Sequence, residues 1–234
     1  MIENLICGAN GKMSEDILIN GLKKCGIAEE MLADLSSKME RYIKEIILFN
    51  SAYNLTNTSE HDELVIRHIL DSLAPYEILK KLIDDYKSDS SFLVADIGSG
   101  GGLPGIPLAA LFPEINFNLV ERMEKRCSFL ENCAAILGLR NVEVVNLQAE
   151  AVPEESYDLI TFRAFRPLDK KMMKTLLRIV KKGGLICAYK AKLENIQAEM
   201  DGIKALVPEY KVEKLSVPYL DEVERNLVII KKMY

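Results

Sequence analysis

The chain has 234 residues, of which 49% are hydrophobic and 28% are charged, and its formal net charge is −5 at pH 7. A chain of this length can bury a full α/β core with room for one small extra element. The acidic balance excludes a surface that binds nucleic acid all over, so any contact with RNA has to come from a local basic patch.

The sequence predicts a cytoplasmic protein that does not contact the membrane. Its apolar runs are far shorter than the ~18 residues that a membrane span needs, and Glu3 with the polar residues at 8–16 interrupts any signal-peptide core. The five cysteines are odd in number and contain no C-x-x-C pair. They are typical of reduced thiols, and we expect neither disulfides nor a metal site.

The first 60 residues predict a helical cap. Residues 1–12 show no strong pattern, a first helix runs to about Lys24 and ends at Gly26, and a second runs from about Glu29 to Asn50. The apolar residues of the second helix recur at a spacing of three to four, which indicates packing between helices. They are Met31, Leu35, Met39, Tyr42, Ile43, Ile46 and Ile47.

A polar bend at 49–56 precedes a third predicted helix, from His61 to about Leu82. His68 and Asp71 share a face of this helix and either form a catalytic pair or tie the helix to its neighbour. Residues 80–91 are charged and rich in serine, which predicts a linker. We therefore expect a cap over 1–60 and a second domain over 61–234, in which 61–90 form a connecting helix and linker.

The centre of the chain is a strand at 92–97, a glycine cluster at 98–105 and a helix that follows from 106. Glycines adopt positive φ at little cost and let the backbone approach a ligand closely. A strand, a glycine turn and a helix form the first part of a βαβ nucleotide-binding unit.

The glycine spacing alone leaves the nucleotide open. The register Gly100-x-Gly102-x-x-Gly105 matches a dinucleotide fingerprint, whereas Asp96-x-Gly98-x-Gly100-x-Gly102 places an acid at the end of the strand. A carboxylate repels a diphosphate but suits the cationic S-adenosylmethionine (SAM). Asp96 therefore favours SAM over NAD.

The next two strands supply further candidates for the cofactor site. Strand 115–121 ends in Glu121, which we predict to bind the ribose hydroxyls, the alternative being that it only caps the helix at 125–137. Arg122, the next residue, is assigned to the same site. Strand 141–147 precedes a loop in which Glu150 or the backbone of Ala149 receives the adenine amine.

Strand 157–162 ends at Arg163, where ligands of open α/β sheets collect. A buried arginine there can bind the methionine carboxylate of SAM and face an acceptor, or it can form only a salt bridge with Asp96 or Asp71. A basic helix at 169–181 is expected to stop at Gly183 and Gly184, before strand 185–190. Helix 193–206 and strands 210–217 and 226–230 follow, the last two close enough for an antiparallel pair.

These elements predict an α/β protein with a Rossmann-like class I SAM-methyltransferase sheet of seven strands, the last one antiparallel, and an N-terminal helical cap. Five segments in this order resemble the family of ribosomal RNA small subunit methyltransferase G, also called glucose-inhibited division protein B. They are 54–56, 67–72, 96–107, 163–165 and 224–228. The resemblance runs from about residue 40 to the end of the chain. The chain departs from the family pattern at two positions. Gly101 stands where the family often has another residue, and Arg166 matches no residue of the family's motif.

The resemblance implies methyl transfer from SAM to N7 of guanine 527, in the 530 loop of bacterial 16S rRNA. The substrate is free rRNA, the 30S subunit or an assembly intermediate, and we expect the enzyme to be a monomer. By position, the resemblance places SAM contacts at Gly98, Leu103, Ala149, Glu150 and Arg163. With the candidates above, the predicted cofactor site is Asp96, Gly98, Gly100, Gly102, Leu103, Glu121, Arg122, Ala149, Glu150 and Arg163.

Guanine N7 carries an in-plane lone pair, so its methylation needs no general base and the site residues should position the substrates. Arg163 and Lys190 are the predicted catalytic residues, each able to contact guanine O6 while N7 stays free. A basic rim for RNA is predicted at Arg122, Lys125, Arg126, Arg166, Lys170, Lys171, Lys190 and Lys192. Alternatives are a SAM-dependent small-molecule methyltransferase, a NAD-dependent oxidoreductase and a non-catalytic RNA-binding protein.

Overall fold

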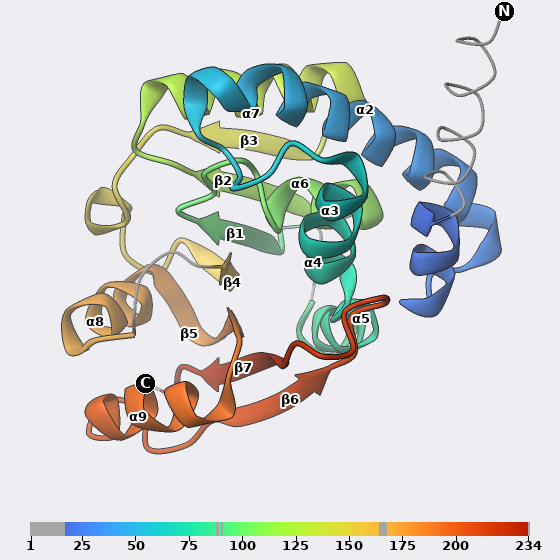
Figure 1. The fold of residues 1–234 in the computed structure, drawn as a ribbon. Coiled ribbons are helices and arrows are strands. Elements are labelled where there is room, and N and C mark those ends of the chain that lie inside the picture. The colour runs from blue at the N-terminus through green and yellow to red at the C-terminus, as the bar shows by residue number, and fades with distance from the viewer. Residues whose placement is uncertain (1–16, 88, 90, 164–167, 234) are drawn as a thin grey trace, which may run out of the picture.

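A computed structural model describes residues 17–87, 89, 91–163 and 168–233. Its centre is a seven-stranded sheet in the order β3-β2-β1-β4-β5-β7-β6 (Figure 1). Strand β7 runs antiparallel to both of its neighbours, and the other pairs are parallel. This confirms the predicted sheet with its reversed last strand. The strands are β1 (Leu93–Ile97), β2 (Asn116–Val120), β3 (Val142–Val145), β4 (Tyr157–Arg163), β5 (Val180–Lys190), β6 (Lys211–Leu215) and β7 (Arg225–Lys231).

Helices cover both faces of the sheet (Figure 1). Residues 17–24 are helical, and the start of that helix lies outside the described residues. The other helices are α2 (Glu29–Tyr53), α3 (His61–Leu64), the π-helical turn η1 (Val65–Leu70), α4 (Asp71–Leu73), α5 (Tyr76–Tyr86), α6 (Gly105–Leu111), α7 (Glu124–Leu137), the 3₁₀ turn η2 (Ala149–Ala151), α8 (Lys170–Ile179) and α9 (Leu193–Ile203). None of the described helices is long and apolar enough to cross a membrane.

The strands divide their side chains between two hydrophobic clusters because neighbouring residues of a strand point to opposite faces. In β5, Leu185 and Cys187 belong to the cluster beneath α2, α6 and α7, whereas Ile186 and Ala188 belong to the cluster beneath α8 and α9. Burial on both faces explains why the central strands are nearly continuous apolar runs.

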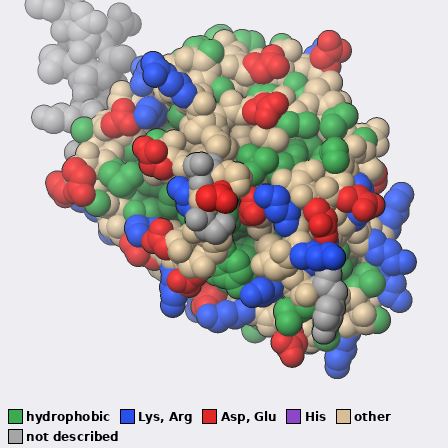
Figure 2. All heavy atoms as spheres, turned by 180° about the vertical axis from the view of Figure 1, so that it is seen from behind, with side chains coloured by type: hydrophobic (Ala, Val, Ile, Leu, Met, Phe, Trp, Pro, Cys, Tyr) green, Lys and Arg blue, Asp and Glu red, His purple; other side chains and the backbone are tan. Residues whose placement is uncertain are grey.

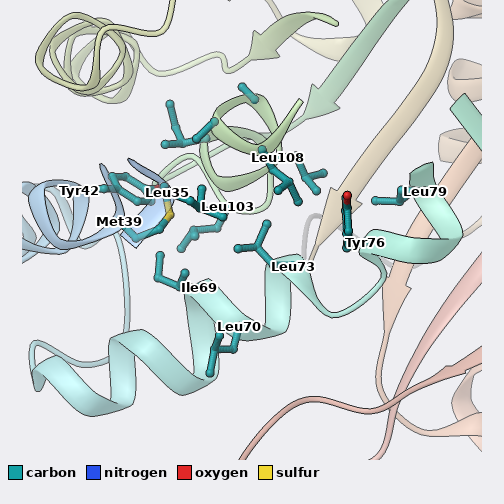
Figure 3. Close-up of a cluster of buried hydrophobic side chains, with 14 of the residues drawn as sticks. Leu35, Met39, Tyr42, Ile69, Leu70, Leu73, Tyr76, Leu79, Leu103 and Leu108 are labelled. Atoms are coloured by element: carbon teal, nitrogen blue, oxygen red, sulfur yellow. The ribbon is translucent and has the colours of Figure 1, made fainter. Parts of the chain in front are cut away.

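The N-terminal helices share the first of these clusters. Met39 and Tyr42 of α2 lie with Ile69 of η1, Leu73 of α4 and Leu108 of α6 (Figure 3). The apolar core of the predicted cap is thus continuous with that of the sheet, and the domain boundary at residue 60 stays a prediction. The apolar stripe of α2 differs from the predicted one at its edge, where Ile47 is 38% exposed.

Two predicted elements were wrong in their extent. The third helix is not continuous to residue 82, because it breaks at Ala74 and Pro75, and α5 then runs to Tyr86 through most of the predicted linker. The basic helix ends at Ile179 rather than at the two glycines, which lie inside β5. There Gly183 has a φ of +74°, and a Cβ on Gly184 would lie 2.7 Å from the Asp158 carbonyl. The glycines permit an irregularity in the pairing of β4 with β5.

Candidate functional site

The glycine turn after β1 is fixed from inside by Asp96. This buried carboxylate accepts hydrogen bonds from the Ser99 hydroxyl at 2.7 Å and from the Gly105 amide at 3.0 Å. A Cβ at Gly105 would lie 2.7 Å from the same carboxylate oxygen, so this position requires glycine. Burial raises the pKa of Asp96 to about 6, although the Ser99 and Gly105 hydrogen bonds act in the opposite direction.

Asp96 and Gly102 support the turn and line neither of the cavities described below. Gly102 has a φ of +88°, and a Cβ there would lie 2.6 Å from Ile106 and 2.9 Å from Leu130. The glycine therefore lets the turn pack onto α6 and α7. The second Asp96 oxygen, Oδ1, is buried without a hydrogen-bond partner among the described residues.

A smaller cavity of about 210 Å³ lies where β1 and β2 end and β3 is followed by η2. It brings together five of the predicted cofactor residues, Gly98, Glu121, Arg122, Ala149 and Glu150, which are distant in sequence. Arg122 and Glu150 are exposed at its rim, whereas Glu121 and Ala149 are buried. The smaller cavity has the position that the βαβ pattern predicts for the nucleoside end of a cofactor.

Glu121 joins the two loops of this cavity. One carboxylate oxygen accepts from the Gly100 amide and the other from the Met123 amide, each at 2.9 Å. Met123 precedes α7, so Glu121 does bind an amide at the start of that helix, as the alternative prediction held. A carboxylate offers about four acceptor positions, and the two amides leave capacity for the hydroxyls of a ligand.

A larger cavity of about 980 Å³ adjoins the glycine turn on its other side. Its walls are residues 55–58, Glu63, residues from η1 and α4, Gly98–Gly101 with Leu103, and Arg126. The ends of β4 and β5, Glu199 of α9, Leu215 of β6 and the beginning of β7 complete the lining. The predicted residues Gly98, Gly100, Leu103, Arg163 and Lys190 all line it.

Arg163 ends β4 and is held by a buried ion pair. Its Nη1 lies 3.1 Å from Asp71 Oδ2, and the other Asp71 oxygen lies 3.1 Å from Nε of Arg225. Asp71 of α4 therefore bridges two arginines, one at the end of β4 and one at the start of β7. The predicted salt bridge of Arg163 is present with Asp71, whereas Arg225, which lies in the segment 224–228, was not predicted as the second partner of Asp71.

His68 also contacts Arg163, so the predicted pair of His68 and Asp71 meets through the arginine. His68 Nδ1 lies 3.2 Å from Nη2 of Arg163 and can only accept there. Burial, reinforced by the Arg163 charge, lowers the pKa of His68 to about 4, so the imidazole is neutral at pH 7.

Lys190 is also paired. Its Nζ lies 2.6 Å from Glu199 Oε2, and the same carboxylate oxygen accepts from the Leu168 amide at 3.0 Å. Lys190 is therefore positioned at the wall of the larger cavity by α9. The predicted residue Arg166 lies outside the described residues. No group of metal-binding side chains is present in the described part of the chain.

One wall of the larger cavity was not predicted, because residues 49–56 indicated only a polar bend. The Asn50 side chain accepts from the Leu55 and Thr56 amides at 2.9 Å and donates to the Thr58 carbonyl at 3.2 Å. Leu55 also lies against Gly101 of the glycine turn, in the larger cavity. The only local signal for these hydrogen bonds is an asparagine in the last turn of a helix, before a polar bend.

The chain is similar to known proteins over most of its length. A family model described as rRNA small subunit methyltransferase G matches residues 35–228. A protein of that name from Treponema denticola is 39% identical over 243 residues, covering 94% of this chain and 95% of its own length. Another from Hydrogenovibrio crunogenus is 41% identical over 199 residues, covering 84% of this chain and 85% of its own length.

Among solved structures, the tRNA (m1A58) methyltransferase TrmI from Aquifex aeolicus resembles the chain with a TM-score of 0.54. The two are 16% identical, and the match covers 82% of this chain and 76% of that one. At this identity the likeness concerns the fold.

Proposed function

The chain belongs to the rRNA small subunit methyltransferase G family of SAM-dependent methyltransferases, and from that premise we propose that it methylates N7 of guanine 527 in bacterial 16S rRNA. The observation that carries the proposal is the pair of adjoining cavities at the carboxyl ends of the strands. The smaller cavity takes the adenosine of SAM and the larger one takes the guanine.

The residues of the smaller cavity fit SAM. Gly98, at the wall of this cavity, has a φ of +71°, and without a side chain its backbone can approach the ligand closely. Glu121 offers acceptors for the ribose hydroxyls, and Ala149 and Glu150 border the place for adenine. Glu121 also places a negative charge beside a cationic cofactor. When bound, SAM supplies a methyl group on a sulfonium, which is electrophilic without further activation.

The larger cavity supports an acceptor that needs no proton removed. Asp71 is held between two arginines, Glu199 is held by Lys190, and the Nδ1 lone pair of His68 faces Arg163. These side chains bind one another, so they position the substrates and do not accept a proton. Holding two substrates in line can lower the barrier by roughly 7–11 kcal/mol. Arg163 and Lys190 then contact guanine O6, and their charges repel the cationic product.

An acidic protein still has to hold RNA. Figure 2 shows Lys and Arg side chains along the right and lower edges of one face of the molecule, with acidic side chains among them. Lys170, Lys171 and Lys192 are exposed, as the proposed rim requires. We place the substrate, as rRNA or as a 30S particle, on this rim of a monomeric enzyme, where phosphate contacts supply affinity without reading sequence.

The test is methyl transfer from labelled SAM to unmethylated 16S rRNA, with free RNA and 30S particles in separate reactions. The expected product is a single N7-methylguanine at position 527, mapped by cleavage at the modified base. A matched RNA with adenine at that position should remain unlabelled. Label at another base or atom would contradict the proposed specificity. Turnover only with small acceptors would favour the alternative, a small-molecule methyltransferase.

A further inference from the structure

Arg126 occupies the junction of the two cavities. It lies in the first turn of α7 and, together with Gly98, is one of two described residues that line both cavities. A Cβ added at Gly100 would lie 3.9 Å from Arg126 Nη1, so the guanidinium lies beside the glycine turn. Any ligand that extends from one cavity into the other passes this guanidinium.

Arg126 differs from the other cations around the larger cavity. Arg163 and Arg225 share Asp71, Lys190 pairs with Glu199, and Arg67 lies 3.8 Å from Glu63. In the described part of the chain, Arg126 has no carboxylate within 4.0 Å, and its one side-chain hydrogen bond goes to the Asn54 carbonyl at 3.3 Å. Its Nε is buried and has no partner there.

A half-buried guanidinium with an unsatisfied N–H is satisfied best by an anion. A carboxylate can accept two parallel hydrogen bonds from the guanidinium, and such charge-assisted bonds are roughly twice as strong as neutral ones. Burying a polar N–H without a partner is costly. The geometry therefore favours an anionic group at the junction, next to the glycine turn.

The identity of this anion rests on the proposed function and follows from the shape of SAM. With adenosine in the smaller cavity and the methyl group facing the larger one, the third substituent of the sulfonium, the amino-acid moiety, begins at the junction. We propose that Arg126 binds the carboxylate of SAM. This removes Arg126 from the predicted basic rim and assigns it the carboxylate contact considered for Arg163, whose guanidinium is held by Asp71 and His68.

The test compares two cofactors that differ only in the carboxylate. Binding of SAM and of decarboxylated SAM is measured by calorimetry for the natural protein, for Arg126→Gln and for Lys125→Gln. Lys125 is the exposed neighbour of Arg126 and lines neither cavity. We expect Arg126→Gln to weaken SAM binding about tenfold or more and to leave the affinity for decarboxylated SAM within about twofold. Lys125→Gln should bind both as the natural protein does.

Arg126→Lys keeps the charge but loses the two-pronged contact, and it should lose a smaller part of the SAM preference, which preserves the test if the glutamine variant does not fold. Equal losses for the two cofactors would overturn the proposal. Unchanged SAM affinity combined with weaker binding of 16S rRNA would also overturn it, because Arg126 would then bind a phosphate of the RNA. A natural protein that binds neither cofactor would instead contradict the proposed function.

Discussion

The two cavities are built in different ways although they share the glycine turn. In the smaller cavity, Glu121 is held by two backbone amides and, within the described residues, forms no ion pair, so its negative charge stays available to a ligand. In the larger cavity, Asp71 and Glu199 are each held by basic side chains. The smaller cavity thus presents a charge to its ligand, whereas the carboxylates of the larger cavity are neutralised by its own basic side chains, which fixes the directions of both partners.

The largest effect is expected from breaking the internal neutralisation. Asp71→Asn leaves Arg163 and Arg225 without their shared carboxylate, and loss of one partner of a buried pair costs about 3–5 kcal/mol. For a chain of this size, that lowers the melting temperature by roughly 10 °C or more. Thermal unfolding of the apoprotein measures it. Glu63→Gln is the control, since it removes the exposed pair with Arg67, worth less than about 1 kcal/mol.

The corresponding substitution in the smaller cavity should mainly weaken ligand binding. Glu121→Ala removes the proposed ribose acceptor, whose charge-assisted hydrogen bonds contribute about 1.5–3 kcal/mol. We expect SAM affinity in calorimetry to fall ten- to hundredfold. The melting temperature should also fall, because the Gly100 and Met123 amides lose their acceptor. Glu124→Gln, an exposed change in the first turn of α7, serves as the control. Unchanged SAM affinity would place the ribose elsewhere.

Arg163→Lys separates charge from geometry in the larger cavity. Lysine can still pair with Asp71, but it lacks the second nitrogen that contacts His68. If Arg163 positions the guanine, single-turnover methyl transfer should slow by about tenfold or more, roughly 1.4 kcal/mol, while the melting temperature changes little. If Arg163 is only a bridge, the lysine variant should keep its rate, and Arg163→Ala should mainly lower the melting temperature.

The smallest effect concerns pH. The pKa of His68 is lowered to about 4 in the folded chain, so between pH 6.5 and 4 the unfolded state binds more protons and acid destabilises the fold. Asp96, with its pKa raised to about 6, acts in the opposite direction. Removing His68 removes this destabilisation and leaves the Asp96 effect in place. His68→Gln should therefore gain stability relative to the natural protein as the pH falls from 7.5 to 5, measured by urea midpoints.

The control for this pH effect has the opposite sign. The pKa of His61 is raised in the folded chain, because hydrogen bonds to Glu40 and Asp62 outweigh its burial. The stability that His61 contributes is present at low pH and is lost as the pH rises through its folded pKa. His61→Gln should therefore lose stability relative to the natural protein on acidification. A difference between His68→Gln and the natural protein that is constant with pH would contradict the prediction.

What the sequence predicts well is local along the chain. The smaller cavity is formed by strand ends and the turns directly after them, so Gly98, Glu121 and Ala149 could be assigned from strand and glycine patterns. The seven strands and the reversed β7 followed from the same patterns. The roles of Asp96 and Gly102 were harder to predict, because a glycine spacing does not distinguish a ligand contact from packing inside the turn.

The larger cavity could be predicted only in part because its contacts join distant segments. Arg163 was recognised from its place at the end of β4, and Asp71 was one of two partners considered for it. Arg225 and the Asn50 hydrogen bonds were missed, because no periodicity or spacing relates the start of β7 to Asp71, or the end of α2 to the segment beside the glycine turn. Arg126 was recognised as basic, but only its position between the cavities distinguishes it from the neighbouring lysine.

The bridge from Asp71 to Arg225 has a consequence for the order in which the protein becomes functional during its own synthesis. Among the described residues, those that line the smaller cavity have all been made once the chain reaches Glu150, whereas the larger cavity also needs Arg225 and Asn226, close to the C-terminus. Chains emerge from the ribosome N-terminus first. A growing or prematurely ended chain therefore contains the residues of the smaller cavity before it contains the second arginine that binds Asp71, so the larger cavity is the last part of the site to be completed.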